Sequence, residues 1–230
     1  MTTPAEYRRL FLQTDDQQTG DFQKAMEAHQ AKAAAVRDNA NAAIARISAR
    51  KDLTLEAKRT AAARVYKPAT EQIRAMLDQH IAKVSAHKQQ LARKAFGYDN
   101  AADPATAMAR RQARQQAAAV TDPEEAERLI RDANFSGDRE LARAVAAASF
   151  ERGWHSVVDV WNEDGSNDAF MRHVVDLVQM PDTNDPAWRM QTAVNYSGPM
   201  PGILDGLKDH EISRAAAADL DVYGDGPEAA

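Results

Sequence analysis

The histidines are the residues best suited to site chemistry in this chain, because the sequence contains no cysteine. The lack of cysteine excludes disulfides, thiolate catalysis and cysteine-based zinc or iron–sulfur sites. His80 and His87 lie one heptad apart on one face of an expected helix, and His29 falls on the seam of the helix before it. A metal site would need these rings to converge, whereas a polar residue in a helical seam more often sets register. We therefore expect no metal site and no cofactor.

Two acidic groups contain residue types that hydrolases use. One is the set Asp159, Glu163 and Asp164, and the other is the adjacent pair His210 and Glu211. Nothing in the sequence positions these side chains for a shared reaction, and acidic residues are common in turns and at helix ends. Phosphate-binding, dinucleotide-binding, HExxH and GxSxG motifs are all missing from the sequence. We therefore expect a protein that is not an enzyme and has no catalytic residues.

A basic cluster is the candidate partner-binding site. Its members are Arg93, Lys94, Arg110, Arg111 and Arg114. Such a cluster fits an acidic protein surface or the phosphates of a nucleic acid. Aromatic residues that would stack on bases are scarce nearby, which favours a protein partner or a solvated helix face. A nucleic-acid-binding regulator that uses residues 88–114 stays as the alternative function.

The charges are distributed unevenly along the sequence, although the net charge is only -5. Residues 46–114 contain 15 basic and 6 acidic side chains, whereas residues 121–230 contain 9 basic and 22 acidic ones. This asymmetry favours head-to-tail association or an oppositely charged partner. Two solvated surfaces of different charge account for the asymmetry equally well, so both interpretations stay open.

The composition predicts an all-α protein with little material for a large core. Alanine occupies 47 of the 230 positions, and aromatic residues make up only 6% of the chain. Alanine, arginine, glutamine, glutamate and lysine are the best helix formers. Because long helices with thin cores are commonly completed by other helices, we expect a homo-oligomer.

The periodicity predicts a long antiparallel helical hairpin, similar to a coiled coil, over residues 1–97. One seam consists of Phe22, Met26, His29, Ala33, Val36, Ala40, Ala43 and Ile47, and the other of Ile73, Leu77, His80, Val84, His87 and Leu91. Thr54 is the expected N-cap of the second helix and Gly97 its C-cap. The short turn between the helices requires them to run antiparallel. Pro68 is expected to kink or divide the second helix.

Three further regions follow this hairpin. Residues 98–120 are expected to form a linker and a surface helix that has almost no large apolar residue. Residues 121–196 are expected to form a small compact helical domain, because they contain all three tryptophans and the strong helix start Asp122-Pro123. Residues 197–230 contain glycine, proline and an acidic end, so we expect a partly ordered acidic tail.

The sequence resembles helical structural and assembly proteins encoded among the head and tail genes of tailed phages of actinobacteria. The resemblance covers about residues 50–165 and rests on "LTLEAKR", "ARKAFG" and the run "DPEEAERLIRDANFSGDRELARAVAAASFERGWHSVVDVW". It implies a virion structural or assembly role, with no catalytic residues to carry over. The partners it implies are other virion proteins.

Taken with the composition, these features predict a non-enzymatic minor head or tail component that acts through protein–protein contacts. It would reside in the virion or the host cytoplasm, since no apolar run is long enough to cross a membrane and no signal peptide is evident.

Overall fold

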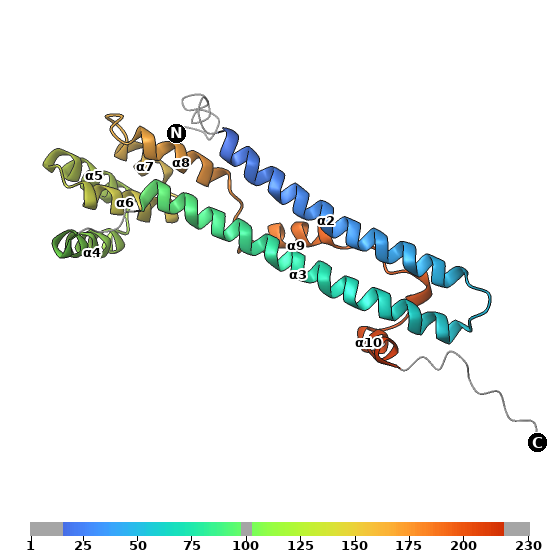
Figure 1. The fold of residues 1–230 in the computed structure, drawn as a ribbon. Coiled ribbons are helices and arrows are strands. Elements are labelled where there is room, and N and C mark those ends of the chain that lie inside the picture. Colours follow the sequence, from blue (N-terminus) through green and yellow to red (C-terminus); the bar gives the residue numbers. More distant parts are fainter. Residues whose placement is uncertain (1–15, 98–102, 219–230) are drawn as a thin grey trace, which may run out of the picture. The chain divides into compact units, whose positions relative to one another are not determined.

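The structure of the chain, a computed structural model, describes residues 16–97 and 103–218, and every regular element within them is helical (Figure 1). The all-α prediction is therefore confirmed. Residues 1–15 of the expected hairpin, 98–102 of the linker and 219–230 of the tail lie outside the described residues. Contacts divide the chain into two compact units. We call residues 20–83 with 182–218 the paired-helix unit, and residues 84–181 the core unit.

The two long helices α2 (Asp16–Ala49) and α3 (Leu55–Phe96) pack together. The Thr54 hydroxyl accepts a hydrogen bond from the Ala57 amide at 3.2 Å, which is the predicted N-cap of α3. At the other end, the Gly97 amide donates to the Arg93 carbonyl at 2.6 Å. A Cβ atom at position 97 would overlap that carbonyl, so the predicted C-cap position accepts only glycine.

The burial of α2 and α3 follows the two predicted seams, since no seam residue is exposed. His29, Ala33 and His80 are buried within them. The expected division at Pro68 does not occur, because α3 runs through it without a break. Pro68 is exposed, so the carbonyl that loses its helical amide partner lies on the solvent side, where water can hydrate it.

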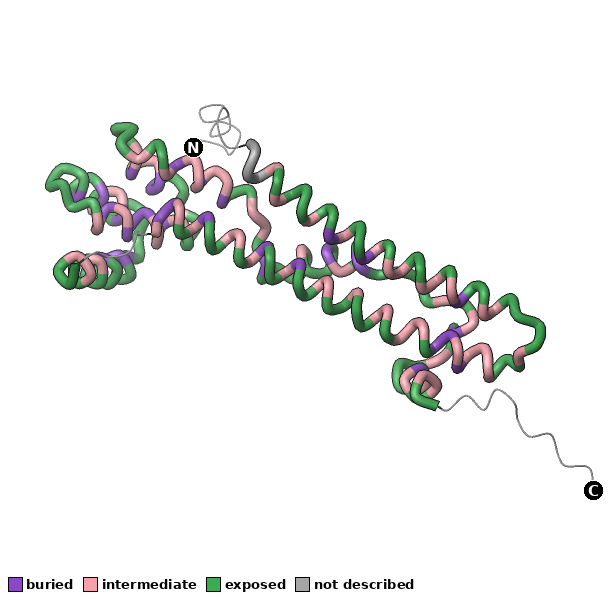
Figure 2. The backbone as a smooth tube through the Cα atoms, in the orientation of Figure 1, coloured by how far each residue is buried: buried purple, intermediate pink, exposed green. Residues whose placement is uncertain are grey.

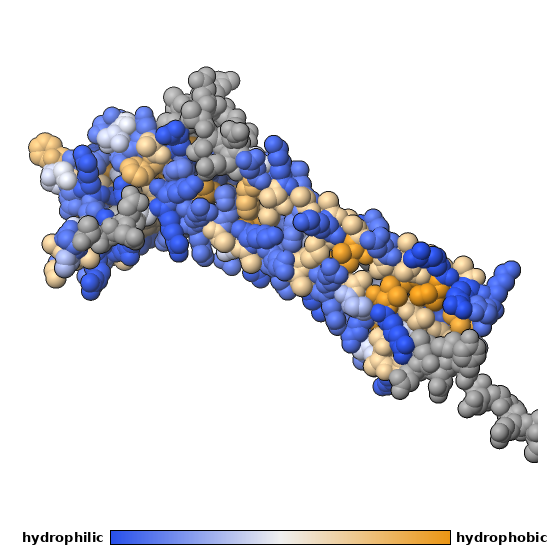
Figure 3. Space-filling model, viewed as in Figure 1, coloured by the Kyte–Doolittle hydropathy of each residue, from blue (hydrophilic) through white to orange (hydrophobic). Residues whose placement is uncertain are grey.

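The C-terminal chain completes the paired-helix unit with three short helices. They are α9 (Pro186–Tyr196), the 3₁₀ helix η1 (Gly202–Leu204) and α10 (Asp209–Ala217). Leu204 and Ile212 are buried in one cluster with Ile44, Ala62 and Ala63. Apolar side chains gather where the end of α2, the start of α3 and the chain around η1 meet (Figure 3).

Residues 197–218 of the expected partly ordered tail form ordered elements with buried side chains, and residues 219–230 lie outside the described residues. The glycines and prolines of this stretch form turns between short helices rather than a loose end. Gly206, for example, adopts a positive φ of 78° directly after η1.

The core unit packs the end of α3 against five helices. These are α4 (Pro104–Ala119), α5 (Pro123–Ser136), α6 (Arg139–Glu151), α7 (His155–Trp161) and α8 (Asp168–Gln179). Trp161 is 2% exposed, and its ring centroid lies 5.7 Å from that of Phe96 on α3. Buried positions lie along the helices of this unit where they meet (Figure 2).

The core unit therefore begins within α3 and ends at residue 181, whereas the sequence predicts a compact domain at 121–196. The last turns of α3 supply Leu91, Ala95 and Phe96 to the core cluster. Trp188 and α9 belong instead to the paired-helix unit.

The helix expected on the surface is an integral part of the core unit. Ala113, Ala117 and Val120 of α4 are buried in the core cluster, and α4 packs against α6. Small side chains let two helices approach closely, so a helix without large apolar residues still packs well. The helix expected at the surface within residues 98–120 thus packs into the core unit through one side, and its other side is exposed.

We predict that Leu204→Ala destabilises the paired-helix unit by about 2–5 kcal/mol, the usual cost of removing a buried leucine side chain. Urea unfolding monitored by circular dichroism measures the change. Met190→Ala is the matched control, because Met190 lies in the same segment but is 73% exposed. The two variants would be equally stable if the C-terminal helices were not part of this core.

Candidate functional site

The five predicted basic residues all lie in the core unit, on two helices. Arg93 and Lys94 occupy the last turn of α3, and Arg110, Arg111 and Arg114 lie on α4. Arg93, Arg111 and Arg114 are exposed, whereas Lys94 and Arg110 are half-buried. Arg93, Arg111 and Arg114 are thus the solvent-accessible members of the cluster.

Arg110 has a structural role. Its Nε atom lies 3.3 Å from a carboxylate oxygen of Glu140, with side chains 18% and 30% exposed. The pair joins α4 to α6, the two helices that pack most extensively in this unit. A partly buried pair of this kind is less screened by salt than a surface pair.

Two arginines that the sequence analysis did not single out secure helix ends. Arg143 donates to the Gly97 carbonyl at 3.0 Å and lies 4.3 Å from the ring centroid of Phe170. Arg152 donates to the Ala117 and Ala118 carbonyls at the end of α4, at 3.2 and 3.0 Å. Cations at helix C-termini stabilise the exposed carbonyls. No local pattern indicates these contacts, because each joins residues more than thirty positions apart in sequence.

The fold also brings the basic and acidic parts of the sequence together. The core unit, residues 84–181, contains 12 basic and 15 acidic side chains, so the basic segment near residues 88–114 shares a unit with much of the acidic one. Part of the asymmetry seen in the sequence is therefore balanced within the chain.

An exposed phenylalanine is the most unusual apolar feature of the core unit. Phe135 is 96% exposed near the end of α5. A C-terminal cap fixes the backbone there: Gly137 has a φ of 75°, and the Asp138 amide donates to the Ala133 carbonyl at 2.8 Å. The aromatic side chain is thus held in solvent by a well-defined turn.

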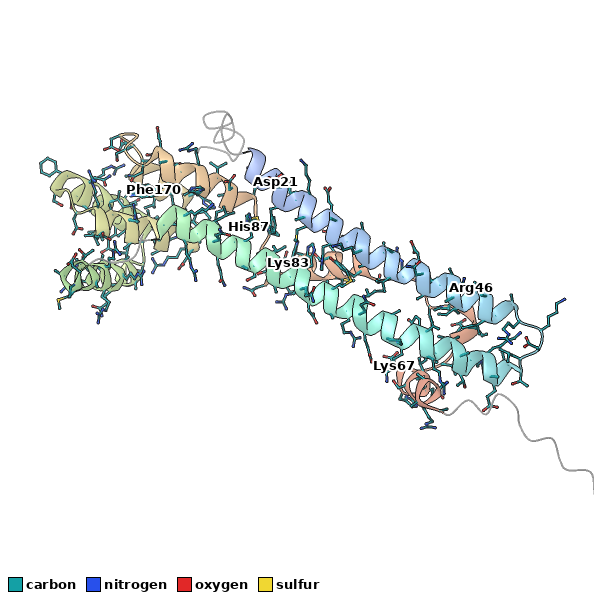
Figure 4. The ribbon with its side chains drawn as sticks, viewed as in Figure 1. Asp21, Arg46, Lys67, Lys83, His87 and Phe170 are labelled. Carbon is teal, nitrogen blue, oxygen red and sulfur yellow. The ribbon has the colours of Figure 1, made fainter. Side chains whose placement is uncertain are left out.

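The paired-helix unit contains a buried histidine cluster. His29 Nε2 lies 2.8 Å from the Met76 carbonyl, and His80 Nδ1 lies 3.1 Å from the Tyr196 hydroxyl. The His29 and His80 ring centroids are 6.4 Å apart, and that of Trp188 is 6.5 Å from His80. Figure 4 places Lys83 on α3 where α9 lies alongside it, and its Nζ atom is 3.4 Å from His29 Nδ1.

Burial determines the protonation properties of this cluster. It lowers the pKa of His80, and the neighbouring His29 and Lys83 charges lower it further. Burial also raises the pKa of the Tyr196 hydroxyl. The uncharged forms of both rings are therefore favoured.

The predicted seam brings His29 and His80 together but places His87 in the core unit. Burial lowers the pKa of His87, Lys94 lowers it further, and Asp176 opposes the shift. Within the described residues, no group of three or more histidine or acidic side chains is arranged to hold a metal ion. Tyr196 was not predicted as a partner, because 116 positions separate it from His80.

The acidic residues considered for hydrolysis stabilise local structure. The Asp164 carboxylate accepts the Ser166 amide at 2.9 Å, and this hydrogen bond lowers its pKa. Glu163 lies 3.6 Å from Arg131, and the Glu211 carboxylate accepts the Lys208 amide at 2.7 Å. These contacts are those of turns, helix starts and surface ion pairs.

We predict that Arg110→Glu destabilises the core unit by about 1–3 kcal/mol, because it places two carboxylates at the junction of α4 and α6. Arg111→Glu is the matched control and should change the stability by less than about 0.5 kcal/mol, since Arg111 is exposed. Thermal unfolding of both variants measures the difference. Equal stability would show that the Arg110–Glu140 pair does not hold the two helices together.

Among the described residues, no helix is both long and apolar enough to span a membrane. Comparison with protein-family models, curated proteins and solved structures finds no match to this chain.

Proposed function

We propose that this chain is a non-enzymatic helical structural or assembly protein of a tailed phage, a minor head or tail component that acts through protein–protein contacts. The observation that carries the proposal is the exposed apolar side chains on otherwise well-packed helices. Phe135 is 96% exposed and Met108 of α4 is 61% exposed. Apolar groups held rigidly in solvent are typical of surfaces that another protein covers.

The paired-helix unit suits the same role if α2 and α3 form an antiparallel, coiled-coil-like hairpin. Two sets of contacts support that arrangement. Ile44, late in α2, packs with Ala62 and Ala63 early in α3, whereas His29, early in α2, contacts Met76 further along α3. Such a hairpin is a rigid element that a particle can use as a spacer or a clamp.

The proposed partners are other virion proteins and further copies of this chain, in the virion or the host cytoplasm. The exposed Arg111 and Arg114, one turn apart on α4, favour an acidic surface on the partner. The same pair supports the alternative, a nucleic-acid-binding regulator that uses residues 88–114. At low salt the first function predicts binding to protein surfaces, including further copies of the chain, and the second predicts binding to nucleic acid.

We predict that the chain is present in purified particles of the phage that encodes it, and that Phe135→Ser lowers its incorporation at least tenfold. The substitution removes an aromatic anchor without disturbing the buried core, so expression and thermal stability should stay unchanged. Quantitative mass spectrometry of the particles measures incorporation. Leu55→Ser, which removes an apolar side chain that is 59% exposed on α3, is the matched control. Absence of the chain from the particles would overturn the proposed function.

Charge is expected to contribute to association. We predict that the chain self-associates at about 50 mM salt and dissociates toward a smaller species at about 500 mM, where screening is stronger. Arg111→Glu combined with Arg114→Glu should give the smaller species at low salt. Lys24→Glu combined with Lys32→Glu changes the net charge equally on α2 and should leave the association intact. Sedimentation velocity measures the mass.

The same variants distinguish the alternative. A labelled DNA duplex that binds the wild-type chain at low salt, and loses its affinity in the double arginine variant, would favour the nucleic-acid regulator. A mass that is constant across salt concentrations would remove charge-driven self-association.

A further inference from the structure

Helix α9 lies against the α2–α3 pair through one face. Trp188, Thr192 and Tyr196 are spaced four residues apart, and Thr192 and Tyr196 are buried. The opposite face carries Met190 and Val194, which are exposed. The inward face contacts the buried His80 ring through Trp188 and Tyr196. The docking of α9 therefore depends on the state of that ring.

His29 is held in the cluster by two polar contacts. His29 Nε2 donates to the Met76 carbonyl at 2.8 Å, because a carbonyl oxygen can only accept. In the neutral ring the other nitrogen, Nδ1, is an acceptor, and it faces the Lys83 ammonium at 3.4 Å. His29 therefore links α2 to α3 through the Met76 carbonyl and the Lys83 ammonium.

The cluster contains three basic side chains from two helices and no compensating carboxylate. His29 comes from α2, and His80 and Lys83 come from α3. From α9 the Tyr196 hydroxyl contacts His80, whereas Arg189 of the same helix donates to the Thr183 carbonyl at 2.7 Å. Among the described residues, none of the three basic side chains forms an ion pair with an acidic one. A charge on His80 would be buried beside Lys83 and His29 without an opposite charge to stabilise it.

We propose that His80, packed beside His29 and Lys83, forms an acid-sensitive latch, which holds α9 on the α2–α3 pair while the His80 ring is neutral and releases α9 when it is protonated. The proposal stands on the geometry of the cluster and does not depend on the proposed function.

The direction of the pH effect follows from the pKa of His80, which is below its ordinary value of 6.5 while α9 is docked. Release returns the ring to solvent and raises its pKa toward the ordinary value, so the released state binds the proton more tightly. The contribution of neutral His80 to docking is complete above pH 6.5. It is lost progressively as the pH falls from there toward the lower pKa of the docked state.

The chain after α9 is held by arginine donors and by apolar packing. Arg59 donates to the Ile203 carbonyl at 3.3 Å, and Arg64 donates to the Ala218 carbonyl. Leu204 and Ile212 are held by apolar packing. Acid should therefore release α9 and leave η1 and α10 in place, which distinguishes the latch from global acid unfolding.

Hydrogen exchange of the full chain, followed by mass spectrometry, tests the latch. We expect the protection of α9 amides, corrected for intrinsic exchange rates, to fall up to about tenfold between about pH 7.5 and about pH 5.5. Peptides from α10 and from the buried part of α3 should keep their protection. Equal loss in all three, or no loss in α9, would overturn the proposal.

Two variants assign the effect to the cluster. His80→Gln removes the titrating group and should abolish the pH dependence in α9, whereas His210→Gln, on an exposed residue of α10, should leave it unchanged. If His80→Gln releases α9 at neutral pH, Lys83→Met tests whether the cluster controls the pH at which α9 is released. Removal of the ammonium should shift the release to lower pH, and an unchanged midpoint would rule the latch out.

Discussion

The small size of the alanine side chains in α2 and α3 is the constraint on which the rest of the structure depends. Ala33, Ala62 and Ala63 are among the most buried residues of the pair, yet each buries only one methyl group. Since each buried methylene contributes about 0.8 kcal/mol, two such helices gain little from each other alone. The C-terminal chain supplies what is missing, because Leu204 and Ile212 close the cluster. A core that we expected other subunits to complete is thus completed, in part, by the chain itself.

The packing of residues 182–218 against α2 and α3 also brings basic and acidic segments into one unit. Residues 46–83 contain 9 basic and 4 acidic side chains, whereas residues 182–218 contain 3 basic and 5 acidic ones, and both belong to one unit. Arg37 donates to the Ser197 carbonyl at 2.9 Å and Arg59 to that of Ile203. In the core unit Arg143 and Arg152 likewise donate to carbonyls at helix ends. Several arginines therefore bind backbone carbonyls, whereas Arg111 is exposed on α4.

Local signals account for the parts of the fold that were predicted. Thr54, Asp122 and Gly97 act within one helical turn, and each begins or ends a helix as expected. The seam periodicity likewise placed His29 and His80 in the interior. The packing of α4 was missed because an alanine stripe looks the same whether it faces solvent or another helix. The docking of α9, η1 and α10 was missed because isolated apolar residues among glycines and prolines have no periodicity, and their partners lie over a hundred positions away.

Phe135 and His80 each lie in an environment that raises the free energy of one of their states. Phe135 is held in solvent although its ring would gain free energy from burial, at about 25 cal/mol for each Å² covered. His80 is buried although its charged form would gain free energy from solvent. The free energy of the Phe135 ring falls when a partner covers it. The free energy of a protonated His80 ring falls when α9 leaves and water reaches it. Because these groups lie in different units, a contact at Phe135 and a release at His80 need not share a trigger. Phe135 can therefore respond to a partner, and His80 can respond to pH, each within its own unit.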